Sequence, residues 1–454
     1  MSLQVSTISD LGIVSTASER RSACLKALLE MRSPSLAVPP WLQAHRDLAA
    51  TKAQTLSIPS SRDEDWRFTD LSALVSAQFL SNTSAPFSID LSEIKSFLIP
   101  EATHRLVFIN GLYCSGLSEV ADLPRGLFVG NLSAALQIES VAAALQNHWA
   151  RQPEREDVFT LLNTASFNDT AVVYVEKNQE IAAPVQLLFL SLDGAGAIAA
   201  HPRGLIVAEK NSSVAVIEEY ASLGFENNLC NAVTEVWLHD NAQMNHTRVQ
   251  RESHAAFHMG KTVVSQARSS RYTCNVLSIG AKLSRHNLEI YQTGEQTETH
   301  LNGLTMIAGE QVGDLHSAIA LTAPHGTTRQ LHKCIVDDRA HAIFNGKVFV
   351  PQAAQMTDAG QLNRNLLLSP KARVDTKPQL EIVADNVRCT HGATVSQLAD
   401  DEVFYLQSRG IDAESAQKLL VYAFAFEIIS QIPIASLQET LAQWARRSPL
   451  EQNT

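Results

Sequence analysis

Cysteine is scarce in this chain of 454 residues. Its six cysteines form no Cys-x-x-Cys pair and no Cys-x-x-His cluster. A disulfide framework needs a denser and more regular set of cysteines, and a closed structural zinc site needs such pairs. We therefore expect neither, and sparse cysteines are typical of a reducing compartment such as the cytosol.

Long apolar runs, a basic leader and an excess of positive charge are also missing. No apolar run approaches the roughly 20 residues of a membrane-spanning helix, and the longest, residues 419–432, is interrupted by Glu427 and Ser430. The N-terminus has no basic segment followed by an apolar one, so we expect no secretion signal. A net charge of −11 argues against nucleic-acid binding, which requires a basic stripe. We expect a soluble protein with no membrane and no nucleic-acid partner.

The motifs of several enzyme classes are incomplete. The sequence GKT at 260–262 ends like a phosphate-binding loop, but Ala255 stands where that loop needs a glycine, and the flanking residues are strand-like. We therefore expect no ATP hydrolysis by this chain and assign no catalytic residue. Neither a Gly-x-Ser-x-Gly elbow nor the carboxylate pair of a glycosidase is evident. The sequence DDR at 337–339 resembles the acidic–basic cluster of β-helical polysaccharide lyases, which leaves a lyase as an alternative.

Helical patterning dominates the first 165 residues. Apolar residues at helical spacing predict helices over Glu19–Met31, Pro40–Leu56 and Ser133–Ala150. The sequence RLVFIN at 105–110 predicts a strand between the last two helices. We therefore expect an N-terminal helical or mixed α/β domain over residues 1–165.

Short apolar runs bounded by polar corners replace this patterning from about Thr170 to Leu398. An open twisted sheet rarely exceeds about ten strands, which leaves a sandwich, a barrel or a solenoid. The corners contain too few glycines and prolines for a set of tight hairpins. Two Gly-Glu-Gln corners, at 294–296 and 309–311, lie fifteen residues apart, which suits a strand pair with its corners. We predict a mainly β solenoid core over residues 166–397. The predicted corners include Lys210-Asn211, Asp240-Asn241, Gly294-Glu295, Gly309-Glu310 and Asp337-Asp338.

Helical patterning returns after Leu398. The first helix, DEVFYLQSR, is capped by Asp400 or Asp401 and ended by Gly410 in this interpretation, and Asp412 caps the next. A last amphipathic piece carries leucines and Trp444. Residues 398–454 thus predict a C-terminal helical domain, which either covers the core or docks a partner.

Two histidine-containing patterns are candidates for metal binding. His254 and His258 are four residues apart, but no carboxylate motif accompanies them, and we interpret them as surface or corner residues. Cys389 and His391 are two apart, so they share a face if the segment is extended. A soft thiolate beside an imidazole can bind iron or sulfur species. The alternative is a packed cysteine beside a hydrogen-bonded histidine, and Gly392 would permit close approach of another backbone.

Three ordered segments add a resemblance to a known family. SRDEDWRFTDLS at 61–72 contains Glu-x-Trp-Arg-x-Thr, and two further segments are residues 341–395 and DEVFYLQSRGI at 401–411. Together they resemble the signature of the SufB/SufD family, which belongs to the SUF machinery of iron–sulfur cluster assembly. The resemblance implies a right-handed parallel β-helix between an N-terminal domain and a C-terminal helical domain. The signature residues are Glu64, Trp66, Arg67 and Thr69.

The family has two branches, and Gly392 decides between them. SufB-like chains carry a glutamate after the histidine, whereas His391 is followed here by Gly392, as in the SufD branch. The resemblance implies a non-catalytic scaffold subunit that pairs with a SufB-like paralogue through the final strands of the β-helix. It also implies that the ABC-type ATPase SufC binds the C-terminal helices. A SufB-type cluster scaffold remains the alternative within the family.

The resemblance also implies a site, a cargo and a compartment. It places cluster assembly and iron relay at the interface with SufB, where His391 faces a cysteine of the partner and Cys389 lies nearby as a second transient metal ligand. We expect no cofactor bound stably by the isolated chain, only a transient iron or iron–sulfur cluster in the complex. We further expect a homodimer when the partner is absent. The compartment is the bacterial cytosol, or the plastid stroma for a plant-type source.

Overall fold

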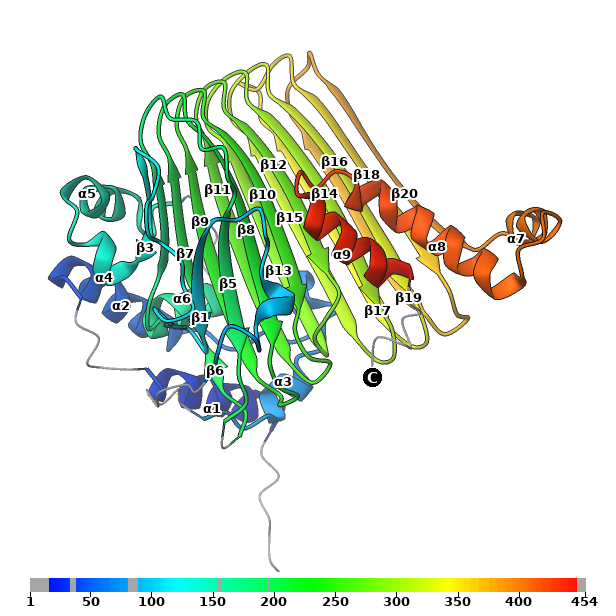
Figure 1. Ribbon diagram of the computed structural model, residues 1–454, viewed down its shortest axis with the longest axis horizontal. Helices are drawn as coiled ribbons and strands as arrows, with labels where there is room; N and C mark the ends of the chain where they lie inside the picture. The colour runs from blue at the N-terminus through cyan, green and yellow to red at the C-terminus, as the bar shows by residue number, and fades with distance from the viewer. Residues whose placement is uncertain (1–15, 33–37, 81–88, 153–156, 195, 447–454) are drawn as a thin grey trace, which may run out of the picture.

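Two facing sheets form the body of the molecule. The computed structural model describes residues 16–32, 38–80, 89–152, 157–194 and 196–446. Its core is a flattened β-solenoid of about eight turns, built from two ten-stranded sheets (Figure 1). The predicted mainly β, parallel β-helical fold is therefore confirmed.

Sheet I contains β1 (His104–Ile109), β2 (Leu112–Tyr113), β5 (Val185–Ser191), β8 (Ser213–Ser222), β10 (Gln243–Arg251), β12 (Arg271–Ser278), β14 (Glu298–Ile307), β16 (Thr327–Val336), β18 (Asp358–Leu367) and β20 (Arg388–Gln397). Sheet II contains β3 (Leu127–Asn131), β4 (Ala171–Val175), β6 (Ala199–Ala200), β7 (Arg203–Ala208), β9 (Leu229–Leu238), β11 (Phe257–Gln266), β13 (Leu283–Gln292), β15 (Val312–Leu321), β17 (His341–Val350) and β19 (Arg373–Ile382).

Strands alternate between the two sheets as the chain winds around the solenoid. After β7 each strand lies in the sheet opposite its predecessor, and each strand from β7 to β18 pairs in parallel with the strand two positions later. Side chains alternate in direction along a strand, so every second residue faces the space between the sheets, which we call the lumen. A continuous set of aliphatic and aromatic residues fills much of this lumen and forms the largest apolar core.

Left-handed residues turn the chain at one edge of the solenoid. Asn211 and Asn241, which are thirty positions apart, both have positive φ, and their amide side chains form a ladder. Asparagine tolerates this conformation better than most residues, which explains corners with little glycine. The predicted corners lie between strands as expected. The Gly-Glu-Gln corners at 294–296 and 309–311, however, flank the single strand β14, so fifteen residues span half a coil and not a strand pair.

The N-terminal region contributes strands to the same two sheets. The predicted strand is β1, which pairs in parallel with β5, and β3 closes sheet II by antiparallel pairing with β4. Strands from before and after residue 165 therefore lie in the same sheets. The domain limits at residues 165 and 397 stay a prediction. The helix predicted over Ser133–Ala150 is divided into two. The helices before the core are α1 (Ala17–Glu30), α2 (Pro40–Ala53), α3 (Ser72–Ser76), α4 (Leu132–Ala135), α5 (Glu139–His148) and α6 (Val158–Ser166), with 3-10 turns at Glu64–Trp66 and Lys95–Phe97.

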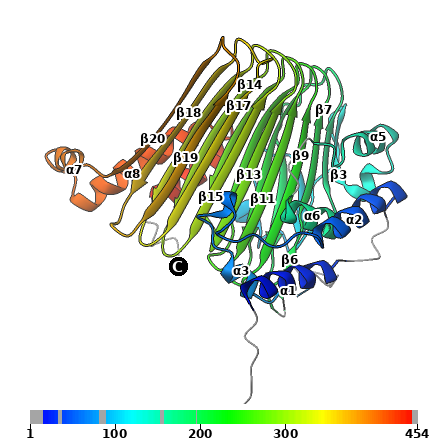
Figure 2. The same cartoon turned by 180° about the vertical axis from the view of Figure 1, so that it is seen from behind.

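Two layers of helices cover the outer faces of the sheets. The helices α1, α2, α3 and α6 lie over sheet II, where α6 is buried along its whole length (Figure 2). The C-terminal helices are α7 (Asp400–Gln407), α8 (Ala413–Ile429) and α9 (Ala435–Arg446). Helices α8 and α9 pack on sheet I, whereas α7 extends past the last strand and has no buried residue (Figure 1).

Of the two helix caps predicted in the C-terminal region, one is correct and one is wrong. Asp412 caps α8 as predicted, because its carboxylate accepts a hydrogen bond from the Ser415 N–H at 3.0 Å. Helix α7 instead begins after Ala399 without a side-chain cap, so the predicted cap at Asp400 or Asp401 is wrong. Among the described residues, no helix is long and apolar enough to cross a membrane.

Candidate functional site

The two predicted site residues lie on the last strand of sheet I. Cys389 pairs in register with Ala359 and His391 pairs with Gln361. Ala359 and Gln361 are buried in the lumen, so Cys389 and His391 share the inward face of β20, as the extended spacing predicted. We call the inward-facing residues of β19 and β20 the open end of the solenoid.

The surroundings of the two residues differ at the open end. His391 is exposed, and its Nδ1 lies 3.2 Å from the Pro378 carbonyl oxygen of β19. Cys389 is half-buried against the apolar core. Burial raises the pKa of the Cys389 thiol, so it stays protonated at neutral pH until a metal ion or another positive group approaches. The imidazole is thus the more available donor in the isolated chain.

The open end also leaves backbone and apolar groups without neighbours. In the described part of the chain, no strand pairs with the outer edges of β19 and β20. Val383 and Val395 beside these edges are 54% and 52% exposed. An unpaired edge with apolar side chains is a surface for strand pairing with another chain. An open depression of about 540 Å³ crosses the same end of sheet I, and its lining includes Gly360 and Thr390 of the outer face besides Gln361 and His391.

Polar groups continue from the open end into the lumen. Gln361 donates to Gln330 at 2.8 Å, and Gln330 is in turn hydrogen-bonded to Ser317. Beside this chain of polar groups, the ring of His332, which is on the same strand as Gln330, stacks on Phe344 of β17 with 5.1 Å between ring centroids.

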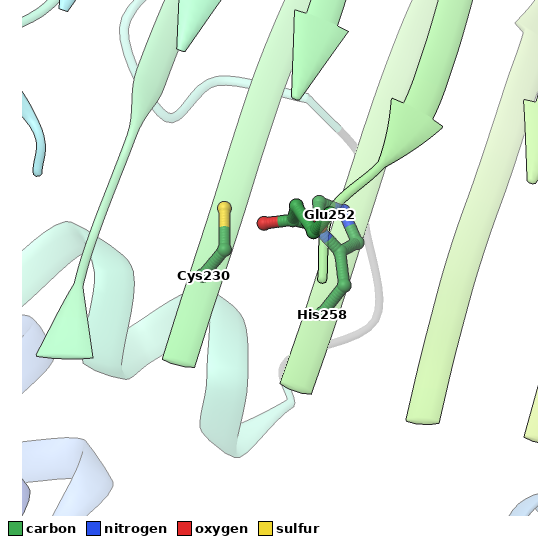
Figure 3. A group of neighbouring side chains, drawn as sticks. All are labelled: Cys230, Glu252 and His258. Atoms are coloured by element: carbon green, nitrogen blue, oxygen red, sulfur yellow. The ribbon is translucent and has the colours of Figure 1, made fainter. Parts of the chain in front are cut away.

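A second cluster of polar residues lies deep in the lumen, and the sequence did not reveal it. Cys230 of β9, Glu252 after β10 and His258 of β11 point toward one another, with donor atoms within 4.8 Å (Figure 3). His258 Nδ1 lies 2.6 Å from Glu252 Oε2. We call these three residues, together with the neighbouring Glu218, His246 and Arg248, the inner cluster; all six are buried.

Opposite charges hold the inner cluster together. Glu218 lies 3.2 Å from His246 and 3.9 Å from Arg248, and Arg248 also contacts the His258 ring nitrogen Nε2. Burial disfavours the charged form of Glu218, but its hydrogen bond with His246 and these positive charges outweigh burial and lower the pKa of Glu218 to about 2. Burial and the Glu252 carboxylate raise the pKa of the Cys230 thiol well above its ordinary value. The cluster is a balanced set of charges enclosed by protein.

The two histidines of the second predicted pattern have separate locations. His254 is exposed in the turn between β10 and β11, as predicted, whereas His258 is fully buried. The prediction of a surface position is therefore wrong for His258. Two residues four positions apart share a face only within one strand. A solenoid corner separates His254 from His258, so their spacing does not place them on the same face.

Two other sequence motifs have structural roles. The segment at 260–262 lies in the middle of β11, where Lys261 Nζ is 3.1 Å from both Asp157 and Glu289, so it forms no phosphate-binding loop. The doublet at 337–338 forms a corner, and the Asp338 carboxylate accepts a hydrogen bond from the Gly309 N–H at 3.0 Å.

Residues of the Glu-x-Trp-Arg-x-Thr signature bind the N-terminal region to sheet II. Thr69 Oγ1 donates to Asp314 at 2.5 Å, and Arg285 donates to the same carboxylate at 2.8 Å. The Arg285 guanidinium also lies 3.8 Å from the centre of the Trp66 ring. Glu64 pairs with Lys377 of β19 at 3.1 Å. The signature residues therefore hold the N-terminal region against the solenoid and do not form a group of metal ligands.

Comparisons with known proteins assign this architecture to one family. The model of the SufBD core domain of the SUF iron–sulfur cluster assembly system matches residues 190–424, and the model of the SufBD N-terminal region matches residues 32–187. An iron–sulfur cluster assembly SufBD family protein of Synechocystis is 46% identical over 433 residues, which cover 92% of this chain and 94% of that protein.

More distant relatives share nearly the same extent. The chloroplastic protein ABCI7 of Arabidopsis thaliana is 35% identical, with 90% of this chain and 86% of that protein covered. The iron–sulfur cluster assembly protein SufD of Escherichia coli is 30% identical, with 86% of this chain and 90% of that protein covered. The similarity thus extends over the solenoid and its flanking regions.

Proposed function

The chain belongs to the SufB/SufD family of iron–sulfur cluster assembly proteins, and from this premise we propose that it is the SufD-type subunit of a SufB–SufC–SufD scaffold. In this role it supports iron acquisition and the assembly of new clusters at an interface with a SufB-like paralogue. Its similarity to proteins named SufD and the glycine after His391 support the SufD type.

One observation carries the proposal. His391 and Cys389 face the lumen where both sheets stop, beside unpaired strand edges and exposed apolar residues such as Val395. A second β-solenoid can pair with such edges and cover the apolar side chains. We infer that a SufB-like chain occupies this end in the complex. A second copy of this chain occupies it when the paralogue is absent.

The chemistry of this interface follows from its donors. His391 offers an imidazole opposite a cysteine of the SufB-like partner, and Cys389 offers a second sulfur. Imidazole and thiolate together are suitable ligands for iron. The iron or iron–sulfur cluster is cargo that the complex holds transiently, and the isolated chain keeps no cluster. Contact with a cation would favour ionisation of Cys389, whose pKa burial raises in the isolated chain.

The chain is a non-catalytic subunit in this proposal, and the ATPase partner docks at the C-terminal helices. Phe404 and Tyr405 of α7 are 70% and 58% exposed, and Leu419 of α8 is also exposed. Exposed aromatic residues on a projecting helix suit a groove on a SufC-type ABC ATPase. The cytosol of a bacterium or the stroma of a plastid is the compartment, which bacterial and chloroplastic relatives support.

The test is co-expression of this chain with SufB-like and SufC-like subunits from the same source. The His391→Ala complex should form with normal stoichiometry and contain much less iron and acid-labile sulfide than the wild type. The control is His300→Ala, which removes a half-exposed histidine from β14 of the same sheet and should leave the cluster content unchanged.

Two results would contradict the proposal. Wild-type iron and sulfide in the His391→Ala complex would show that the residue has no part in cluster assembly. A stable cluster on the isolated chain after anaerobic reconstitution with iron and sulfide would favour a SufB-type scaffold instead.

A further inference from the structure

We propose that Cys230, Glu252 and His258 of the inner cluster bind one divalent metal ion of borderline character, such as Zn²⁺, Co²⁺ or Fe²⁺. The three residues come from β9, from the position just after β10 and from β11, and their donor atoms lie within 4.8 Å of one another (Figure 3). This inference is independent of the proposed scaffold role, because it concerns residues far along the solenoid from β20.

The donor set suits such an ion. A thiolate, a carboxylate and a neutral imidazole carry two negative charges, which balance a divalent cation in a site without solvent. Zinc and related ions accept this mixture of sulfur, oxygen and nitrogen ligands. Three protein ligands leave the fourth tetrahedral position open, which is typical of sites that exchange a ligand and not of closed structural sites.

Close packing beside the three donors gives a second observation. Gly260 of β11 lies two residues after His258, and a Cβ atom at this position would lie 2.6 Å from Arg248 Nη2, 2.8 Å from His258 Nε2 and 2.9 Å from His286 Nδ1, so only glycine lets these side chains converge here. His286 is buried, and neither of its ring nitrogens is hydrogen-bonded to a side chain among the described residues. An imidazole without a side-chain partner beside the cluster is a further donor for an incoming ion.

Hydrogen bonds hold the cluster together without an ion. Arg248 can only donate, so His258 Nε2 accepts and the imidazole proton lies on Nδ1, which faces Glu252. Gln250 also donates to Glu252 at 3.1 Å. Metal binding at Nδ1 therefore moves the imidazole proton to Nε2, releases the thiol proton of Cys230 to solvent, and turns Arg248 toward Glu218.

The measurement uses Co²⁺ as the probe. Full-length protein, refolded from denaturant with excess Co²⁺ and then dialysed, should retain one ion per chain and absorb in the near ultraviolet through thiolate-to-cobalt charge transfer. Cys230→Ala should lose both the ion and the absorption. The matched control is Cys334→Ala, because Cys334 is equally buried in the lumen but has no place in the cluster. The double variant Cys389→Ala/His391→Ala should retain the ion.

If Cys230→Ala fails to fold, X-ray absorption spectroscopy of the Zn²⁺-loaded wild type identifies the ligands of the ion directly. The proposal predicts one sulfur and at least two nitrogen or oxygen neighbours around zinc. No retained ion, a first shell without sulfur or with several sulfurs, or loss of binding in the Cys389→Ala/His391→Ala variant would overturn it. A positive result would also correct the expectation that the isolated chain binds no cofactor, and the cluster content of the complex tests the proposed function separately.

Discussion

The open end and the inner cluster present similar residue types in opposite surroundings. Both place a cysteine and a histidine in the lumen, yet His391 is exposed, whereas His258 is fully buried with Glu252 and Arg248 around it. At the open end one side of the site has no neighbouring coil. Coils on both sides enclose the inner cluster. The comparison teaches that position along the solenoid, and not residue type, decides which site can meet another protein.

The largest expected difference between the two regions is in stability. Arg248→Ala should lower the free energy of unfolding by about 3–5 kcal/mol, because it leaves buried carboxylates without their positive partner. Arg388→Ala, on the outer face of β20 beside the open end, should change it by less than about 0.5 kcal/mol. Urea unfolding followed by circular dichroism measures both. Equal effects would contradict the contrast between the enclosed and the open region.

The second prediction concerns helix α7, which projects past the last strand and exposes two aromatic residues. The double substitution Phe404→Ala/Tyr405→Ala should weaken binding of the SufC-type ATPase by about 2 kcal/mol or more, the range of interface hot spots. Deleting all three C-terminal helices is a poorer test, because α8 and α9 cover apolar residues of sheet I. Leu48→Ala on α2 is the control for an exposed residue elsewhere. Calorimetric titration that gives the same affinity for wild type and double variant would refute the docking site.

The third prediction tests the unpaired strand edges. The isolated chain should form a two-fold dimer at micromolar concentration, and Val395→Lys should convert it to a monomer, because charge at an edge opposes strand pairing. Phe225→Lys changes a residue that is still more exposed, at 88% against 52%, and lies far from the edge, so it should leave the dimer intact. Light scattering after gel filtration reports the mass. A monomeric wild type would rule out pairing through this edge.

The fourth prediction concerns the pH dependence of the inner cluster. Burial alone lowers the pKa of His246, but hydrogen bonds with Cys274 and Glu218 outweigh burial and raise the pKa to about 9, above the ordinary 6.5. Because the folded state binds this proton more tightly, the contribution to stability is complete below pH 6.5 and is lost as the pH rises through 9. Urea midpoints of the wild type should therefore fall across this range. His246→Gln should remove that part of the slope, and an unchanged slope would refute the ion pair.

A small effect on stability is also expected for His391 itself. His391→Ala should change the free energy of unfolding by less than about 1 kcal/mol, because the side chain is exposed and makes one contact with a backbone carbonyl. His258→Ala should cost about 1–3 kcal/mol, because it leaves buried groups without a partner. A larger loss for His391→Ala than for His258→Ala would assign His391 a structural role.

The sequence predicts the local features of this molecule better than its long-range contacts. Helix α2, the cap at Asp412 and the corner at Asn211 depend on neighbouring residues, and all three were predictable. Helix α6 was missed because it is short and buried on every side, so that even its polar residues, such as Asn163, form hydrogen bonds inside the protein and mark no exposed face. The fifteen-residue spacing of the two Gly-Glu-Gln corners indicated a repeat. It did not show that one full coil takes about twice that length, as the Asn211–Asn241 ladder does.

The same limit applies to the sites. Cys389 and His391 lie on one strand, so alternation alone places them on one face. Cys230, Glu252 and His258 come from three places in the chain, and only the register between coils brings them together. A sequence pattern can find donors that share a strand, whereas donors stacked across coils require the structure.

The central claim is that the open end of the lumen meets the SufB-like partner, and a disulfide trap tests it most directly. The complex is assembled with His391→Cys, oxidised mildly, and separated on a non-reducing gel, with His300→Cys on the outer face of the same sheet as the control. The account predicts a covalent heterodimer for His391→Cys alone, with the linked partner cysteine identified by mass spectrometry. No link from position 391, or an equal link from position 300, would contradict it.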